Sequence, residues 1–106
     1  MKTIAVVSHK GGTGKSTLSI HLAVQAQSEG RDTLLVDLDH LSSTVAEWAS
    51  IRTDKHPLSV TAKVSDIIEL QQQAIAEGFD LLILDCPPYF NDDTDQITQL
   101  ADFTIL

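Results

Sequence analysis

A glycine-rich segment between an apolar run and a helical pattern constrains this chain more than any other feature. Residues 8–17 have the sequence SHKGGTGKST and follow the apolar residues 4–7. After the segment, Leu18, Leu22 and Ala26 recur at helical spacing, so we expect them to form the inner face of a helix. The order predicts a strand, a glycine turn and a helix in direct succession.

The glycine segment suits a phosphate group. Glycines let backbone N–H groups converge on an anion, and a helix N-terminus adds further donors and a positive dipole end. Lys15 would place its charge on the β- and γ-phosphates, and the Ser16 hydroxyl would be a ligand for Mg²⁺. The alternative is a glycine turn that only joins a strand to a helix, which needs no flanking lysines. The residues predicted to bind the nucleotide are Lys10, Gly11, Gly12, Thr13, Gly14, Lys15, Ser16 and Thr17.

Acidic residues follow two further apolar runs. Asp37 and Asp39 come after residues 33–36, and Asp85 ends the most apolar run, residues 79–84. Short apolar runs that alternate with helical patterns predict a doubly wound, mostly parallel α/β sheet with helices on both faces. Ligands bind such sheets at the carboxyl ends of the strands, so we expect these acids to meet the glycine loop there. Ordinary solvated strand ends are the alternative for Asp37 and Asp39.

The later part of the chain predicts more elements of the same kinds. A helix over about 15–28 should stop at Gly30, and a helix over about 65–77 should stop at Gly78. Strands are expected at 58–60 and from 103. The residues predicted to face inward are Val45, Trp48 and Ala49 in the second helix, Val64, Ile68 and Ile75 in the third, and Ile97, Leu100 and Ala101 in the fourth.

Length and charge narrow the classes of protein. With 106 residues the chain forms at most one domain, and residues 103–106 look like a strand that has just begun. We therefore expect residues 1–106 to be a P-loop nucleotide-binding domain that is incomplete at its C-terminal end. The net charge is −8 with 7 basic residues, so any nucleic-acid contact is expected to lie largely outside this segment or to depend on a partner.

Cysteine content and hydropathy exclude further classes of protein. Cys86 is the single cysteine, which excludes an internal disulfide and a four-cysteine metal or cluster site within one chain. The N-terminus has no signal-peptide pattern, and no stretch approaches the length of a membrane span. We expect a cytoplasmic protein and no stable membrane insertion of this segment.

Departures from the common P-loop pattern point to one family. The strict pattern would have a glycine where this chain has His9, and a second lysine, Lys10, precedes the glycines. The arrangement Lys-Gly-Gly-x-Gly-Lys-Ser resembles the deviant Walker A motif of the ParA/MinD family of ATPases. The D-x-D segment at Asp37 and Asp39 resembles switch I of that family, and residues 85–88, DCPP, resemble its Walker B and switch II segment.

The resemblance implies a P-loop NTPase-like fold, of which this chain would be only the N-terminal half, with ATP and Mg²⁺ bound at the strand ends. It assigns catalytic roles to Lys10, Lys15 and Asp39, and metal-binding roles to Ser16, Asp37 and Asp85. Lys10 would reach the partner's ATP in a homodimer that forms on ATP binding, and Asp39 would orient the attacking water. His40 and Leu41 replace the usual Pro-Gln of partition ATPases, and Cys86 replaces the commoner threonine. We expect His40 to be a variable loop residue and Cys86 to pack.

By the same resemblance, the chain is expected to be a small ParA-type ATPase for plasmid or chromosome partition. Its implied partners are nonspecific DNA and a centromere-binding protein that stimulates hydrolysis, in the cytoplasm or nucleoid of a bacterium or archaeon. A MinD-like regulator of division-site placement and a nonenzymatic nucleotide-binding or assembly module are the alternatives. A reductase resembling the nitrogenase iron protein is disfavoured, because that role needs cluster cysteines and Cys86 is alone.

Overall fold

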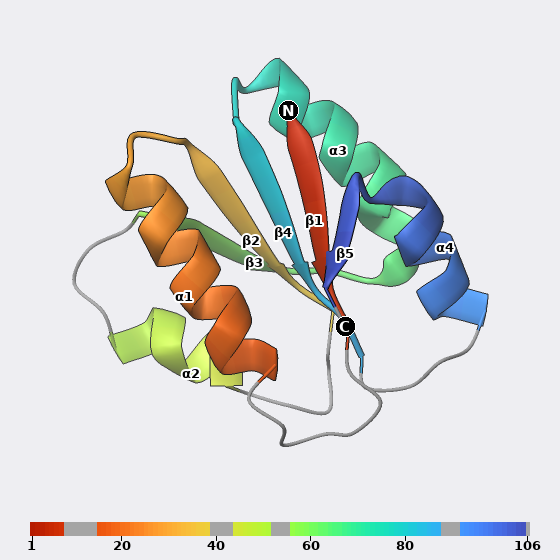
Figure 1. Ribbon diagram of the computed structural model, residues 1–106, viewed down its shortest axis with the longest axis horizontal. Coiled ribbons are helices and arrows are strands. Elements are labelled where there is room, and N and C mark those ends of the chain that lie inside the picture. The colour runs from red at the N-terminus through yellow and green to blue at the C-terminus, as the bar shows by residue number, and fades with distance from the viewer. Residues whose placement is uncertain (8–14, 39–43, 52–55, 88–91, 106) are drawn as a thin grey trace.

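The chain folds as strands that alternate with helices around one sheet (Figure 1). The computed structural model describes residues 1–7, 15–38, 44–51, 56–87 and 92–105. Its elements are β1 (Lys2–Val6), α1 (Lys15–Ser28), β2 (Thr33–Asp37), α2 (Thr44–Ile51), β3 (Leu58–Thr61), the 3₁₀ turn η1 (Val64–Asp66), α3 (Ile67–Ala76), β4 (Leu81–Asp85), α4 (Asp92–Leu100) and β5 (Phe103–Ile105). The helix and strand positions agree with the predicted ones to within a few residues.

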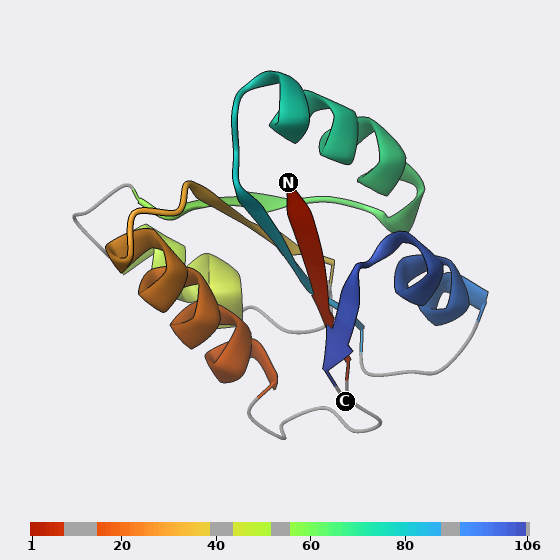
Figure 2. The same cartoon turned by 45° about the horizontal axis from the view of Figure 1, so that its top comes forward.

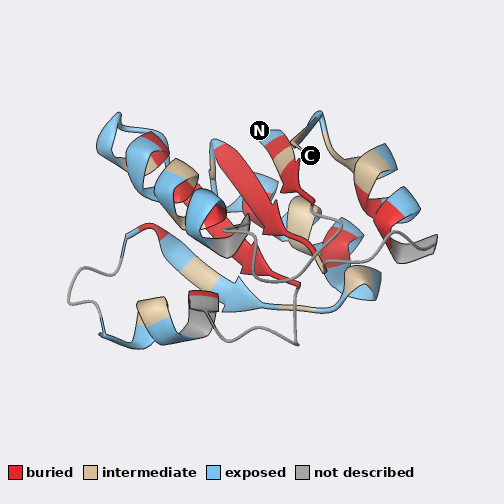
Figure 3. Ribbon diagram, turned by 60° about the horizontal axis from the view of Figure 1, so that its bottom comes forward, coloured by how far each residue is buried: buried red, intermediate tan, exposed pale blue. Residues whose placement is uncertain are grey.

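The sheet has five strands in the order β3-β2-β4-β1-β5. Every pairing between these neighbours is parallel. Every residue of β2 and of β4 is buried, because helices cover both faces of the sheet, and Figure 3 shows the buried residues running along its strands. The predicted parallel α/β sheet is confirmed.

Helices α1 and α2 lie on one face of the sheet, and α3 and α4 lie on the other (Figure 2). Each face has its own cluster of buried apolar side chains. The cluster beneath α1 and α2, called here the first cluster, contains Val6, Ala23, Ala26, Leu35, Val45, Leu81 and Ile83. The cluster beneath α3 and α4, called here the second cluster, contains Ala5, Val7, Leu34, Val36, Leu38, Ile67, Ala74, Leu82, Leu84, Cys86 and Ile97.

Small side chains form the buried face of α1. Ser19 and Ala23 are 0% exposed and Ala26 is 9% exposed, whereas Leu18 is 41% exposed. The prediction that Leu18 lies on the inner face is therefore wrong, and Leu22 is only partly buried against the first cluster. Small side chains allow the helix to lie close to the sheet, and this close approach decides which face turns inward.

The buried face of α3 also differs from the prediction. Ile68 and Ile75 are 57% and 61% exposed, so their predicted inward orientation is wrong. Ile67 and Ala74 are buried instead, and Leu70 packs against the same second cluster. Residues 67, 70 and 74 follow helical spacing, and the adjacent isoleucines give the pattern two possible phases.

Apart from Ala49, which is only half-buried, the other predicted inner residues and the helix stops are confirmed. Val45 and Ile97 are buried, and the partly buried Trp48, Val64, Leu100 and Ala101 pack against the two clusters. Gly30 and Gly78 have φ angles of 86° and 84°, a left-handed conformation that glycine adopts without a Cβ clash. Among the helices of the described ranges, none has the length and apolar character needed to cross a membrane.

Candidate functional site

The carboxyl ends of β2, β4 and β1 lie side by side in register. Asp85 at the end of β4 is the Cα partner of Asp37 on β2 and of Val6 on β1. Just past the strands, the Leu38 N–H donates to the Asp85 carbonyl at 2.9 Å, and the Cys86 N–H donates to the Val6 carbonyl at 3.1 Å. Backbone hydrogen bonds therefore fix the position of Asp85 from both neighbouring strands.

Two of the three predicted acids come together at this edge. Asp37 is 4% exposed and Asp85 is 0% exposed. Their side chains face α1 and α2, because Leu35 and Ile83, two residues earlier on the same strands, belong to the first cluster. The third predicted acid, Asp39, lies outside the described residues.

A serine on α1 contacts this acidic pair. The Ser19 Oγ donates a hydrogen bond to Asp85 Oδ1 at 3.0 Å, and both residues are fully buried. Sequence reasoning missed Ser19, since a serine beside Leu18 looks like part of an exposed polar face. Its spacing from Lys15 and Ser16, four and three residues, is the signal that could have placed it on their side of the helix.

The two elements on either side of the predicted phosphate loop meet at the same edge. The loop joins the end of β1 to α1, whose first residue is Lys15 and whose N-terminal end lies at the carboxyl ends of the strands (Figure 1). The first turn of a helix has unpaired N–H groups and a positive dipole end, both of which attract an anion. Thr17 is exposed there. Lys10, Gly11, Gly12, Thr13 and Gly14 lie outside the described residues, and only the helical backbone is described at Lys15 and Ser16.

The oxygen donors at this edge fit a magnesium ion. Mg²⁺ in nucleotide sites is usually held by one or two carboxylates together with waters and phosphate oxygens. Asp37 and Asp85 place two carboxylates in adjacent register, next to the helix that starts with Lys15 and Ser16. Within the ranges that the structure describes, no group of three or more His, Cys, Asp or Glu side chains could hold a metal.

The side chain that follows Asp85 belongs to a different environment. Cys86 is 0% exposed and lies in the second cluster, on the opposite face from the Asp85 carboxylate. Its Sγ lies 3.5 Å from the Leu84 carbonyl oxygen, to which the thiol donates a weak hydrogen bond. Cys86 therefore packs, whereas His40 and Leu41 lie outside the described residues.

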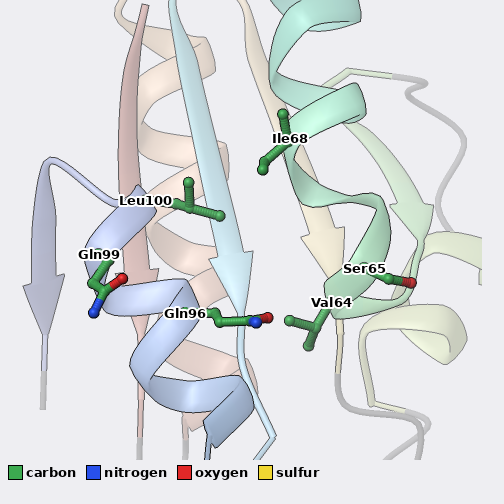
Figure 4. Close-up of a pocket in the computed structure, with 6 residues that line it drawn as sticks. All are labelled: Val64, Ser65, Ile68, Gln96, Gln99 and Leu100. Carbon is green, nitrogen blue, oxygen red and sulfur yellow. The ribbon is translucent and has the colours of Figure 1, made fainter.

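A pocket on the other face lacks the features of a phosphate site. It has a volume of about 410 Å³ and lies between the start of α3 and α4 (Figure 4). Its lining consists of Val64, Ser65, Ile68, Gln96, Gln99 and Leu100. None of these side chains is charged, and the paired carboxylates of Asp37 and Asp85 face away from it. The carboxyl edge beneath α1 is therefore the candidate nucleotide site.

Sequence comparisons place this arrangement among known proteins. Residues 4–102 match the family described as the CobQ/CobB/MinD/ParA nucleotide binding domain. The chain is 39% identical over 69 residues to the virulence plasmid ParA family protein pGP5-D of Chlamydia psittaci, covering 64% of this chain and 27% of that protein. It is 26% identical over 117 aligned residues to the chromosome-partitioning ATPase Soj of Thermus thermophilus, covering 83% and 47%.

A structural comparison agrees on the fold. A chain of the MinC:MinD cell division protein complex from Aquifex aeolicus superposes with a TM-score of 0.64 at 16% identity. The superposition covers 98% of this chain and 55% of that one. The chain thus spans about half the length of that chain of the complex, 47% of the length of Soj and 27% of the length of pGP5-D.

Proposed function

The chain belongs to the CobQ/CobB/MinD/ParA family of nucleotide-binding domains, and from that premise we propose that it is a ParA-type ATPase for plasmid or chromosome partition. One observation carries the proposed ATP site. Asp37 and Asp85 are buried register partners at the carboxyl edge, directly beside the helix that begins with Lys15. The relatives named as a plasmid ParA family protein and a chromosome-partitioning ATPase support the partition role.

Each residue of the proposed site has one chemical task. Lys15 neutralises the β- and γ-phosphates, while the N–H groups of the loop and of the first turn of α1 bind phosphate oxygens. Ser16, Asp37 and Asp85 would hold Mg²⁺, directly or through water. The bound ion would offset negative charge on the phosphates during transfer. Asp39 orients the attacking water by accepting its hydrogen bond.

Dimerisation completes the proposed site. Lys10 from a second copy of the chain adds positive charge to the transferring phosphoryl group, because phosphoryl transfer depends mainly on positioning and charge stabilisation. ATP then links hydrolysis to the dimeric state. We place the nonspecific DNA contacts beyond residue 106, since this segment carries a net charge of −8. A centromere-binding protein is the proposed stimulating partner.

A binding and hydrolysis experiment tests the proposed site. Binding of N-methylanthraniloyl-ATP in the presence of Mg²⁺ and release of phosphate from ATP are measured for wild type and for Lys15→Ala. We expect Lys15→Ala to weaken nucleotide binding about tenfold to a hundredfold, since it loses a charge-assisted hydrogen bond to phosphate. Hydrolysis should fall to the background rate.

A matched lysine serves as the control. Lys2 is exposed at the start of β1, at the opposite edge of the sheet, so Lys2→Ala should behave like wild type. Equal hydrolysis by wild type and Lys15→Ala would contradict the ATPase proposal. If wild type binds the nucleotide but hydrolyses none, the nonenzymatic binding module is the correct alternative.

A further inference from the structure

Ser19 is a buried polar residue to which the proposed mechanism gives no role. We infer that Ser19 is a positioning residue, whose hydroxyl holds the Asp85 carboxylate in the orientation that the Mg-nucleotide site uses. This inference rests on the proposed function and deepens it. It adds to the site a residue that lies outside the glycine loop and outside the three acidic positions.

The hydrogen bond joins two elements that are far apart in sequence. Ser19 lies in the second turn of α1, and Asp85 is the last residue of β4. The Oγ to Oδ1 distance of 3.0 Å is within the usual range for a hydroxyl that donates to a carboxylate. Both side chains are 0% exposed, so bulk water cannot take the place of this hydroxyl.

The geometry differs from that of an ordinary serine in a helix. Helical serines usually face solvent or donate to the carbonyl one turn earlier, as Ser28 donates to the Gln25 carbonyl at 2.8 Å. The Ser19 hydroxyl reaches a carboxylate on the sheet. Because the two oxygens of a carboxylate share one plane, a donor on Oδ1 also restricts where Oδ2 points.

The same contact ties the phosphate-binding helix to the metal-binding strand. Lys15 and Ser16 lie about one helical turn before Ser19 in α1. A hydrogen bond from this turn to Asp85 therefore fixes the distance between the start of α1 and the end of β4. A Mg-nucleotide requires its phosphates and its Mg²⁺ to be bound at a fixed separation. The distance between the start of α1 and the end of β4 sets the separation that the site offers.

Magnesium dependence of nucleotide binding distinguishes positioning from simple packing. The affinity for N-methylanthraniloyl-ATP is measured over a Mg²⁺ titration and again in EDTA, with the thermal midpoint of the nucleotide-free protein as a check of folding. We expect Ser19→Ala to raise the Mg²⁺ concentration needed for half-maximal binding about fivefold to tenfold, while affinity in EDTA stays within about twofold of wild type. Ser28→Ala, the same change on the same helix, should match wild type in both conditions.

Each outcome is assigned in advance. Equal losses with Mg²⁺ and in EDTA would show a packing role only, and an unchanged Mg²⁺ titration would show no role; either result overturns the inference alone. Wild type that fails to bind the nucleotide overturns the proposed function as well. If Ser19→Ala does not fold, Ser19→Cys keeps most of the side chain with a weaker donor. A smaller shift in the same direction supports positioning, and no shift overturns it.

Discussion

Buried polar side chains in the described part of this protein have hydrogen-bond partners. No buried side-chain nitrogen or oxygen lacks a hydrogen-bond partner within the described part of the chain. Ser19 donates a hydrogen bond to Asp85 beneath α1, and the Asp102 carboxylate accepts the Thr3 N–H at 2.7 Å at the other end of β1. Because an unpaired buried group costs about 1–3 kcal/mol, the strand-end acids can be buried only where the fold supplies donors.

At the residue scale, the reactivity of the single thiol measures how well the second cluster is closed to solvent. Cys86 is 0% exposed in the second cluster, so a thiol reagent reaches it only after the protein opens. We expect native protein to react with 5,5′-dithiobis(2-nitrobenzoate) at least about a hundredfold more slowly than protein unfolded in guanidinium chloride. Equal rates in the two states would contradict the position of Cys86.

Helix α3 begins with two adjacent isoleucines, of which only one is buried. Ile67 faces the second cluster and its neighbour Ile68 faces outward, although both are isoleucines in the same turn. Leu70 and Ala74 follow Ile67 by three and seven residues, so these three side chains lie on one face of the helix. The adjacent isoleucines therefore form a natural pair for comparing a buried and an exposed position on one helix.

At the element scale, this pair gives a stability prediction. Ile67→Ala should lower the free energy of unfolding by roughly 2–5 kcal/mol, because it leaves a cavity beneath α3. Ile68→Ala, at a position 57% exposed, should change it by about 0.5 kcal/mol or less. Urea denaturation followed by circular dichroism measures both variants.

A milder substitution covers the case in which Ile67→Ala does not fold. Ile67→Val should lower the free energy of unfolding by about 0.5–1.5 kcal/mol. Equal losses at the two positions would mean that the helix is rotated relative to the structure described above.

The elements and their order could be predicted from the sequence, whereas the phases of α1 and α3 and the cross-element contacts could not. The apolar runs before Asp37 and Asp85 mark two strand ends, and parallel topology brings such ends to one edge. The inward turn of Ser19 depends on how closely α1 approaches the sheet. No local pattern contains that distance, because it is set by the small side chains of Ala23 and Ala26 together with the partner on β4.

Across the whole molecule, the central position of β4 explains where a nucleotide site can form. β4 lies between β2 and β1, so its last residue lies between the two strand ends that lead into the predicted switch and phosphate segments. The buried carboxylates of Asp37 and Asp85 and the start of α1 therefore lie at one end of the sheet. This arrangement is the setting for the proposed role of Lys10.

At this scale, oligomeric state tests Lys10. Light scattering with Mg²⁺ and a non-hydrolysable ATP analogue should give twice the mass of one chain for wild type. Lys10→Ala should stay near the mass of one chain, because the partner's phosphates lose their cross-subunit charge. Lys2→Ala, the exposed lysine at the opposite edge, should dimerise like wild type. A Lys10→Ala dimer of wild-type affinity would contradict the cross-subunit role.

The pairing of β1 also determines how long this strand stays open to aggregation during synthesis. β1 pairs only with β4 and β5 among the described strands, and both are translated after it. An apolar strand with two open edges is a template for pairing with other nascent chains. Residues 2–6 therefore leave the ribosome early and lack their native strand partners until residue 81 and beyond have followed, so a pause in translation between those points prolongs an aggregation-prone state of the chain.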